Sequence, residues 1–492
     1  MGTPEEWSDA MSEDQTLSYD VVVIGGGAVG ENAADRAART GLSVLVVERE
    51  LVGGECSYWA CMPSKALLRP GSVLAQARAV PGAAELITGT LDPALVLARR
   101  DEFTSHWDDH GQVEWLESAG LALLRGSARF TGEKELLVED EETGTSTRVI
   151  ARHAVIVASG SEPVIPGIPG LAESQPWTSR EATAVEQVPG RLVILGGGVV
   201  GVEMATAYRD LGAEVTLIVR GDRVLTGAEP FAAEEVGTAL RDLGVDLRFG
   251  TETTAVRRDS GGVHLTVTGP QGESTLDADE LVVATGRRPR TADLGLEVLG
   301  LDGLTVDDAL QVPGHDWLFA VGDVTGRTAT THQGKYDARV AGDVVAARFG
   351  DDESLREQER AAGDWSRFRA TADHAAVPQV VFTRPEVAWV GLTEQQARDA
   401  GRTVRAVSYP IGSVAGASVS ADGYHGTAQI VVDEDAGVIV GATFTGPDAA
   451  ELLQTATTAV VAGTPLDRLW HAVPAYPTVS EVWLRLLETT GL

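Results

Sequence analysis

Cysteine is scarce in this chain, because Cys56 and Cys61 are the only two among its 492 residues. The pair cannot build a structural zinc site alone, since such a site takes about four ligands and the 9 histidines are scattered along the chain. A permanent stabilising disulfide across so short a loop would gain little, because little entropy is lost when the loop closes. The pair is therefore a candidate for redox chemistry.

Positive charge is also scarce, with 39 Lys and Arg against 72 Asp and Glu and a formal net charge of -33. This balance excludes a nucleic-acid groove, which needs a basic surface, and it repels anionic membranes. A membrane span needs about 18 consecutive apolar residues, and no apolar run in this sequence is that long. Residues 1–18 are acidic and lack an apolar signal core. We expect them to be a disordered tail of a cytoplasmic protein, in a compartment where permanent disulfides are rare.

Glycine is plentiful, and its first cluster belongs to a nucleotide-binding pattern. A short apolar strand over 19–24, a glycine-rich turn, an alanine-rich helix and a second strand ending in Glu48 follow one another. This order and spacing suit an adenine dinucleotide. Gly25, Gly27 and Gly30 let the backbone approach the pyrophosphate, and Glu48 is placed to bind the adenosine ribose. A cysteine pair just downstream of such a unit favours a redox-active disulfide that takes electrons from a flavin.

The same pattern occurs a second time. A strand over 191–195 leads into a turn containing Gly196, Gly198 and Gly201, then a helix and another strand. The second strand ends at Arg220 and carries no acid. An acid there would bind the 2′-hydroxyl of NAD, whereas an arginine suits a 2′-phosphate. The sequence therefore favours NADPH, with NADH as the alternative if Arg220 is only a solvated surface residue.

Three further strand ends are candidate nucleotide contacts, at Gly160, Gly286 and Asp323. Each follows a short apolar run, and Asp323 is suitably placed to bind the ribityl chain of a flavin. Farther along, residues 350–372 are rich in charge and alanine and predict a helix. The segment 375–492 has short β-prone runs at 378–382 and 429–432 and a helical stretch near 447–463, which indicates a separate α+β domain.

These motifs, in this order, resemble the pyridine nucleotide–disulfide oxidoreductases, which include lipoamide dehydrogenase, glutathione reductase and mercuric reductase. The similarity covers about residues 18–492, and its most specific part is the run Gly-Gly-x-Cys-x4-Cys-x-Pro-Ser-Lys at 53–65. The resemblance implies an α/β fold with two Rossmann-like domains, for FAD and NAD(P), and a C-terminal α+β domain that forms a homodimer. Each active site is then built from both subunits. The expected division is 1–18 tail, 19–160 FAD-binding domain (first part), 161–285 NAD(P)H-binding domain, 286–365 FAD and central domain (second part), and 375–492 dimerisation domain.

The resemblance also implies roles for single residues. Cys61 corresponds to the charge-transfer thiolate against the flavin, and Cys56 to the interchange thiol that attacks substrate. Lys65 corresponds to the lysine near flavin N5, and Glu203 to its partner; the alternative for Glu203 is an acid on a helix surface. The residues assigned to FAD are Gly25, Gly27, Gly30, Glu48, Glu55, Cys56, Lys65, Gly160, Asp323 and Thr331. Those assigned to NADPH are Gly196, Gly198, Gly201, Glu203, Arg220 and Gly286.

The C-terminal motif departs from the family pattern. The family has His-Pro-Thr-x-Ser-Glu, where the histidine shuttles protons and the glutamate orients it. Here Tyr476 stands in the place of the histidine, while Glu481 is retained. A histidine with a pKa near 6.5 both takes and gives protons at neutral pH, whereas a tyrosine near 10 mostly donates. His471 is the alternative proton donor if the backbone follows a different course.

These observations predict an FAD-dependent NAD(P)H oxidoreductase with no metal site. Two cysteines exclude the additional C-terminal redox centres of mercuric reductases and of high-molecular-weight thioredoxin reductases. Three destinations for the electrons stay open: a small disulfide, a quinone reduced directly by the flavin, or a role as a flavoprotein subunit of a larger complex. Tyr58 and Trp59, between the cysteines, either pack the helix or form a flat wall for a planar acceptor such as a quinone.

Overall fold

The structure, a computed structural model, describes residues 16–492. The predicted tail over 1–18 lies outside these residues except for its last three, which begin the first strand. The chain divides into two compact units. The first comprises residues up to Gly54, Asp108–Ser161 and Pro289–Ala370, and the second comprises Glu55–Trp107, Glu162–Arg288 and Thr371–Leu492. The finer domain boundaries expected from the sequence stay a prediction.

The first unit is built on a sheet with the strand order β3-β2-β1-β6-β5-β4, and β16 pairs with β6. Its central strands are parallel and carry apolar side chains on both faces, as strands covered on two sides do. Strand β1 begins at Thr16 and not at Tyr19, because residues 16–19 pair with 148–151 of β6. The strands are β1 (Thr16–Ile24), β2 (Val44–Glu48), β3 (Ala122–Arg125), β4 (Ser127–Gly132), β5 (Glu135–Asp140), β6 (Thr145–Val157) and β16 (Leu318–Ala320).

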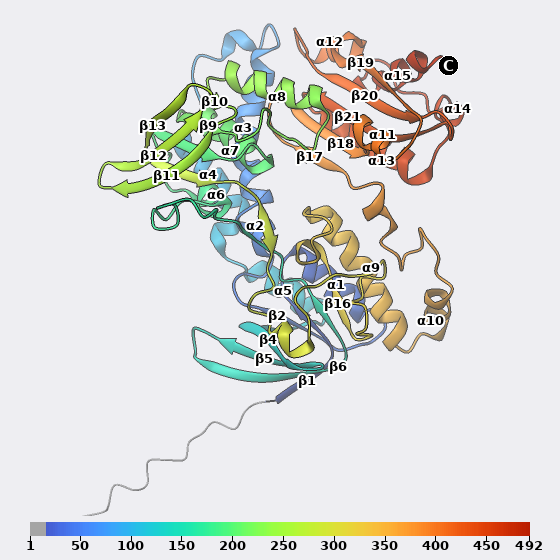
Figure 1. The fold of residues 1–492 in the computed structure, drawn as a ribbon. Helices are drawn as coiled ribbons and strands as arrows, with labels where there is room; N and C mark the ends of the chain where they lie inside the picture. The colour runs from blue at the N-terminus through green and yellow to red at the C-terminus, as the bar shows by residue number, and fades with distance from the viewer. Residues whose placement is uncertain (1–15) are drawn as a thin grey trace, which may run out of the picture. The chain divides into compact units, whose positions relative to one another are not determined.

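Two helices of this unit lie side by side, α1 (Ala28–Ala38) and α9 (Thr331–Phe349) (Figure 1). Gly342 permits their close approach, since a Cβ there would lie 2.4 Å from Cβ of Arg36. Arg36 also forms an ion pair of 2.6 Å with Asp343. The remaining helical segments of the unit are α5 (His110–Ser118), α10 (Glu353–Arg360), η3 (Leu296–Leu299) and η4 (Gly322–Thr325).

The prediction of one helix over 350–372 was wrong. Helix α9 ends at Phe349, and α10 covers only Glu353–Arg360. The helix cannot continue through the segment after Arg360, because Trp365 takes a positive φ of 62°.

The second unit contains the other nucleotide-type sheet, in the order β10-β9-β8-β14, with all neighbours parallel. A three-stranded antiparallel sheet, β11-β12-β13, is inserted in the chain between β10 and β14. The strands are β8 (Arg191–Leu195), β9 (Glu214–Ile218), β10 (Asp246–Arg248), β11 (Glu252–Asp259), β12 (Gly262–Gly269), β13 (Gly272–Ala278) and β14 (Glu280–Val283), and two short strands are β7 (Ser161–Pro163) and β15 (Arg287–Pro289). The helical segments are α2 (Gly54–Tyr58), α3 (Cys61–Arg78), η1 (Ala84–Leu86), α4 (Pro93–Phe103), η2 (Ser105–Trp107), α6 (Ser179–Ala184), α7 (Val199–Asp210) and α8 (Pro230–Asp242).

The C-terminal part of the second unit is α+β, as predicted. Its sheet has the order β17-β18-β21-β20-β19, and the predicted β-prone runs form β17 and β20. Its core is a cluster of apolar residues between this sheet and the helices that pack on it. The strands are β17 (Gln379–Val381), β18 (Glu386–Gly391), β19 (Val404–Pro410), β20 (Thr427–Asp433) and β21 (Val438–Gly446). The helical segments are η5 (Thr371–His374), α11 (Glu394–Asp399), η6 (Ile411–Ser413), α12 (Ala415–Ser420), η7 (Ala449–Leu452), α13 (Leu453–Ala462), α14 (Leu466–Leu469), η8 (Val479–Glu481) and α15 (Val482–Thr490).

Candidate active site

The turn between β1 and α1 can be made only by glycine. Gly25 has φ of +103°, and a Cβ there would lie 2.4 Å from the backbone oxygen of Ala158. A Cβ on Gly30 would lie 1.8 Å from the backbone oxygen of Gly25. The turn is therefore compact, and the N-terminal N–H groups of α1 remain available to an anion such as a pyrophosphate.

Of the polar residues predicted to contact FAD, Glu48 ends a strand, Asp323 lies just beyond one, and Thr331 begins a helix. Glu48, buried at the end of β2, accepts hydrogen bonds from the N–H groups of Gly26 at 2.6 Å and Glu50 at 2.8 Å. Asp323 accepts a hydrogen bond of 2.6 Å from the Ser161 hydroxyl. Thr331 is the first residue of α9. A glycine turn, a strand-end acid and a second acid beyond β16 fit the pyrophosphate, ribose and ribityl groups of FAD.

Glu31 was missed by sequence reasoning, although it follows Gly30 directly. It lies in the first turn of α1, and its Oε1 is buried with no hydrogen-bond partner within residues 16–492. Burial raises the pKa of Glu31 to about 7. The attraction to Lys335 opposes this shift, and a smaller repulsion from Glu48 adds to it. The carboxyl therefore keeps its proton to a higher pH than an exposed glutamate does.

The second nucleotide turn repeats the geometry of the first. Gly196 has φ of +113°, and a Cβ on Gly201 would lie 1.9 Å from the backbone oxygen of Gly196. Gly198 is the N-cap of α7. Arg220 lies two residues beyond the end of β9 and is exposed, and Gly286 follows β14 with φ of +129°. A turn of this shape suits the pyrophosphate of a dinucleotide, and the guanidinium of Arg220 is exposed just beyond the end of the following strand.

The two cysteines lie on consecutive helices of the second unit. Cys56 is in α2, and Cys61 is the first residue of α3. Both side chains are half-buried. Ala60 separates the helices with φ of -132° and ψ of -93°, which is not helical, so the two helices do not merge. The chain thereby brings both sulfur-bearing residues to one short, bent segment.

Lys65 and Glu203 form the ion pair that the resemblance implies, with Nζ 2.8 Å from Oε2. Glu203 is only 3% exposed, so it is not an acid on a helix surface. Its Oε1 accepts the N–H of Phe382 at 3.0 Å, and the ring of Phe382 lies 4.9 Å from Lys65 Nζ. Phe382 is a second residue that sequence reasoning missed.

The segment between the cysteines is packed and does not form a flat aromatic wall. Tyr58 is only 2% exposed. The guanidinium of Arg180 lies 3.9 Å from the ring centre of Trp59 and covers that ring. Glu55 pairs with Arg287 at 2.6 Å. The interpretation of these aromatics as a platform for a planar acceptor is therefore corrected, because packing against α6 occupies them.

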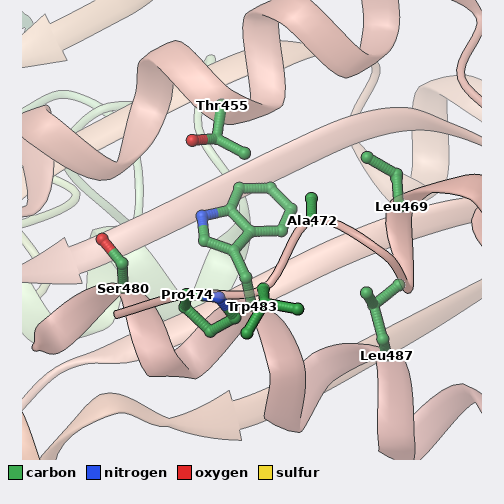
Figure 2. A pocket seen from close by; sticks show the side chains of 8 residues that line it. Thr455, Leu469, Ala472, Pro474, Ser480, Trp483 and Leu487 are labelled. Carbon is green, nitrogen blue, oxygen red and sulfur yellow. The ribbon is translucent and has the colours of Figure 1, made fainter. Parts of the chain in front are cut away.

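The first and last residues of the C-terminal motif, Tyr476 and Glu481, differ in their exposure to solvent. Tyr476 is 77% exposed, whereas Glu481 is buried and its Oε1 accepts a hydrogen bond of 2.6 Å from Arg485. Ser480 and Trp483, which flank Glu481 in the chain, line a cavity of about 280 Å³ (Figure 2). Figure 2 shows the Trp483 indole reaching between Thr455 and Pro474. The other lining residues are Leu469, Ala472, Val473 and Leu487.

Within residues 16–492, no hydrogen bond or ion pair joins Tyr476 or Glu481 to Lys65 or Glu203. His471 is exposed, in the turn after α14. A single chain thus assembles the ion pair but leaves Tyr476 exposed to solvent, whereas Glu481 is buried.

The chain matches the family model of the pyridine nucleotide-disulphide oxidoreductases over residues 19–338 and the dimerisation domain of the same family over residues 377–486. It is 32% identical to a dihydrolipoyl dehydrogenase of Haloferax volcanii over 485 residues, covering 96% of this chain and 97% of the relative. It is 33% identical to a mercuric reductase of Streptomyces lividans, covering 96% of both chains. The HOCl-induced flavoprotein disulfide reductase RclA of Escherichia coli has a similar structure, with a TM-score of 0.80, 26% identity and coverage of 96% and 99%.

The chain belongs to the pyridine nucleotide–disulphide oxidoreductase family. It is an FAD-dependent oxidoreductase that works with a pyridine nucleotide, with two dinucleotide-binding domains and a C-terminal dimerisation domain. None of the helices described in residues 16–492 combines the length and the apolar character that crossing a bilayer requires.

Glu31→Gln tests the buried carboxyl of this family member. Because its pKa is raised above the value in the unfolded chain, the folded state holds the proton more tightly. The free energy of unfolding should therefore fall by about 2–3 kcal/mol as pH rises from about 4.5 through about 7, and Glu31→Gln should abolish that fall. The measurement is urea unfolding at pH 5 and pH 8 with FAD in constant excess. Asp35→Asn, which changes an exposed acid of the same helix, is the control, and an unaltered pH dependence in Glu31→Gln contradicts the assignment.

Proposed function

We propose that this enzyme passes electrons from NADPH, through FAD, to a Cys56–Cys61 disulfide and on to a small disulfide substrate. The observation that carries the proposal is the pair of Lys65 with the buried Glu203, on the helices that follow the cysteine segment and the second glycine turn. A lysine held by a buried carboxylate supplies a fixed positive charge close to two cysteines, where it favours a thiolate. Relatives named dihydrolipoyl dehydrogenase and mercuric reductase support the same electron route.

The reaction balances as NADPH plus a proton plus R–S–S–R giving NADP⁺ and two R–SH. FAD, which the first glycine turn would hold, would supply an acceptor for the hydride of the nicotinamide and a donor of the electron pair to the cysteine disulfide. The Cys56 thiolate then attacks one sulfur of the substrate and releases the first R–S⁻. Cys61 attacks the mixed disulfide on Cys56, releases the second R–S⁻ and restores the Cys56–Cys61 bond. Both leaving thiolates need protons.

We propose that the working enzyme is a homodimer in which Tyr476 of one subunit serves the cysteines of the other. The match of residues 377–486 to the family's dimerisation domain supports two copies. The 77% exposure of Tyr476 supports a role outside its own chain. Tyr476 donates a proton to a leaving thiolate readily but is a poor proton acceptor near neutral pH. This chemistry favours substrates whose thiols leave easily over lipoamide or ordinary alkyl disulfides.

Two cysteine variants test the electron route. Two-electron reduction of the purified yellow enzyme should give a long-wavelength charge-transfer band from the Cys61 thiolate against oxidised flavin. Cys61→Ser should abolish this band, whereas Cys56→Ser should show it without reduction, because Cys61 is then a lone thiolate. The measurement is an anaerobic absorbance titration with NADPH. A band that survives in Cys61→Ser would show that the two sulfurs are assigned the wrong way round.

Arg220→Ala tests the choice of nucleotide. One charged hydrogen bond to the 2′-phosphate contributes about 1.5–3 kcal/mol, so the Michaelis constant for NADPH should rise roughly tenfold or more. The constant for NADH should hardly change, because NADH has no phosphate at that position. Steady-state kinetics with both nucleotides measure this, and a wild-type enzyme that clearly prefers NADH would refute the assignment.

Tyr476→His tests the altered proton donor. A positioned general acid is worth about 10²–10⁴-fold, so restoring histidine should raise turnover of oxidised glutathione by about tenfold or more. Reduction of a quinone by the flavin should stay unchanged, since it does not use the interchange thiol, and it serves as the control reaction. High glutathione reductase activity in the wild type, lost in Cys56→Ser, would show instead that another acid such as His471 serves.

A further inference from the structure

Phe382 touches both members of the ion pair between Lys65 and the buried Glu203. Its N–H donates to Glu203 Oε1 at 3.0 Å, and the face of its ring lies 4.9 Å from Lys65 Nζ. Glu203 Oε2 accepts from Lys65 at 2.8 Å, so both carboxylate oxygens have a partner. One residue thus fixes the carboxylate through its backbone and contacts the ammonium through its side chain.

The backbone of Phe382 is itself anchored. Two residues later, Arg384 Nη2 binds Asp210 Oδ1 at 2.6 Å. Glu203 and Asp210 are seven residues apart on α7, which is close to two turns, so they lie on one face of that helix. Helix α3 packs closely there, since a Cβ on Gly71 would lie 1.9 Å from Asp210 Oδ2. Residues 382–384 therefore run along α7 and are fixed at both ends.

The ring of Phe382 matters because the salt bridge to Glu203 does not by itself confine the Lys65 side chain. The Lys65 side chain is 35% exposed, whereas that of Glu203 is 4% exposed. A lysine has a flexible stem of four carbons and a compact charge that water solvates strongly. An aromatic face attracts the ammonium through its quadrupole and occupies space that the stem would otherwise sweep. Removing the ring would let Nζ move toward solvent while the salt bridge to Glu203 still holds one hydrogen bond.

We propose that Phe382 is a positioning residue of the redox site, which holds the Lys65 ammonium in place through its ring and the Glu203 carboxylate through its N–H. The proposal rests on the proposed function, because it takes Lys65 to act on the Cys61 thiolate and the flavin. It connects the first strand of the dimerisation domain, β17, to the ion pair of the redox site.

Phe382→Leu is the test, with two matched variants. Phe382→Tyr keeps an aromatic ring, and Phe249→Leu removes a similar ring that lies 5.1 Å from Arg241 elsewhere in the same unit. The readouts are the pH midpoint of the charge-transfer band in reduced FAD-loaded enzyme, the stopped-flow rate of flavin reduction by NADPH, and the Michaelis constant for NADPH. In Phe382→Leu the pH midpoint of the charge-transfer band should move to higher pH. The rate of flavin reduction should fall about two- to tenfold, which corresponds to the free energy of one cation–π contact. The Michaelis constant should stay unchanged.

Phe382→Tyr and Phe249→Leu should both behave as the wild type. A Phe382→Leu enzyme with a wild-type midpoint and rate overturns the proposal, and so does an equal change in Phe249→Leu, which would indicate general loosening. If Phe382→Leu does not fold, Phe382→Met replaces it with a similar volume and no ring, and the same outcomes decide. A wild type that lacks the band overturns the proposed function together with this inference, whereas a wild-type band that Phe382→Leu leaves unaltered overturns the inference alone.

Discussion

Glu203 is only 3% exposed, so its negative charge must be balanced by partners that contact it directly. This requirement is the constraint on which the second unit depends. Removing one partner of a buried ion pair costs about 3–5 kcal/mol, because the remaining charge stays out of water. Lys65 on α3 and the N–H of Phe382 meet the requirement from two directions. The helix that carries Cys61, the helix of the second glycine turn and the start of the C-terminal sheet are thereby tied to a single side chain. Replacing the pair by apolar residues would keep the packing but remove the charge beside the cysteines.

The two nucleotide turns have the same backbone geometry, although they are expected to bind different ligands. In both, the first glycine has a positive φ and the third lies so close to the first that no side chain fits. These constraints fix where a pyrophosphate can approach, and they say nothing about which dinucleotide binds. The two units differ at the end of the next strand, where the first has Glu48 and the second has Arg220. An acid suits ribose hydroxyls and a guanidinium suits a 2′-phosphate, which is the contrast on which the proposed use of NADPH rests.

The sequence predicted the elements whose pattern is local. The strands of both nucleotide units and the β-prone runs of the C-terminal domain are present in the structure. The Lys65–Glu203 pair, which joins residues 138 positions apart, was implied by the family resemblance and is also present. It failed over 350–372, where charge and alanine suggested a helix that the positive φ of Trp365 interrupts. It could not find Phe382 or Arg180, because each acts through a contact with a residue more than a hundred positions away. Glu31 was overlooked because the pattern marks the glycines before it, whereas its character comes from burial.

The bulky segment between the cysteines needs support from outside, and α6 supplies it. Arg180 covers the Trp59 ring, and the Thr183 hydroxyl donates to the Trp59 carbonyl at 2.9 Å. Behind α6, the buried guanidinium of Arg100 donates to the carbonyls of Thr183 and Val185, which end that helix. A chain of polar contacts thus runs from α4 through α6 to the cysteine segment. Disulfide exchange requires two sulfurs that return to bonding distance after every turnover. A segment held by such contacts keeps that spacing even though Tyr58 and Trp59 within it are bulky.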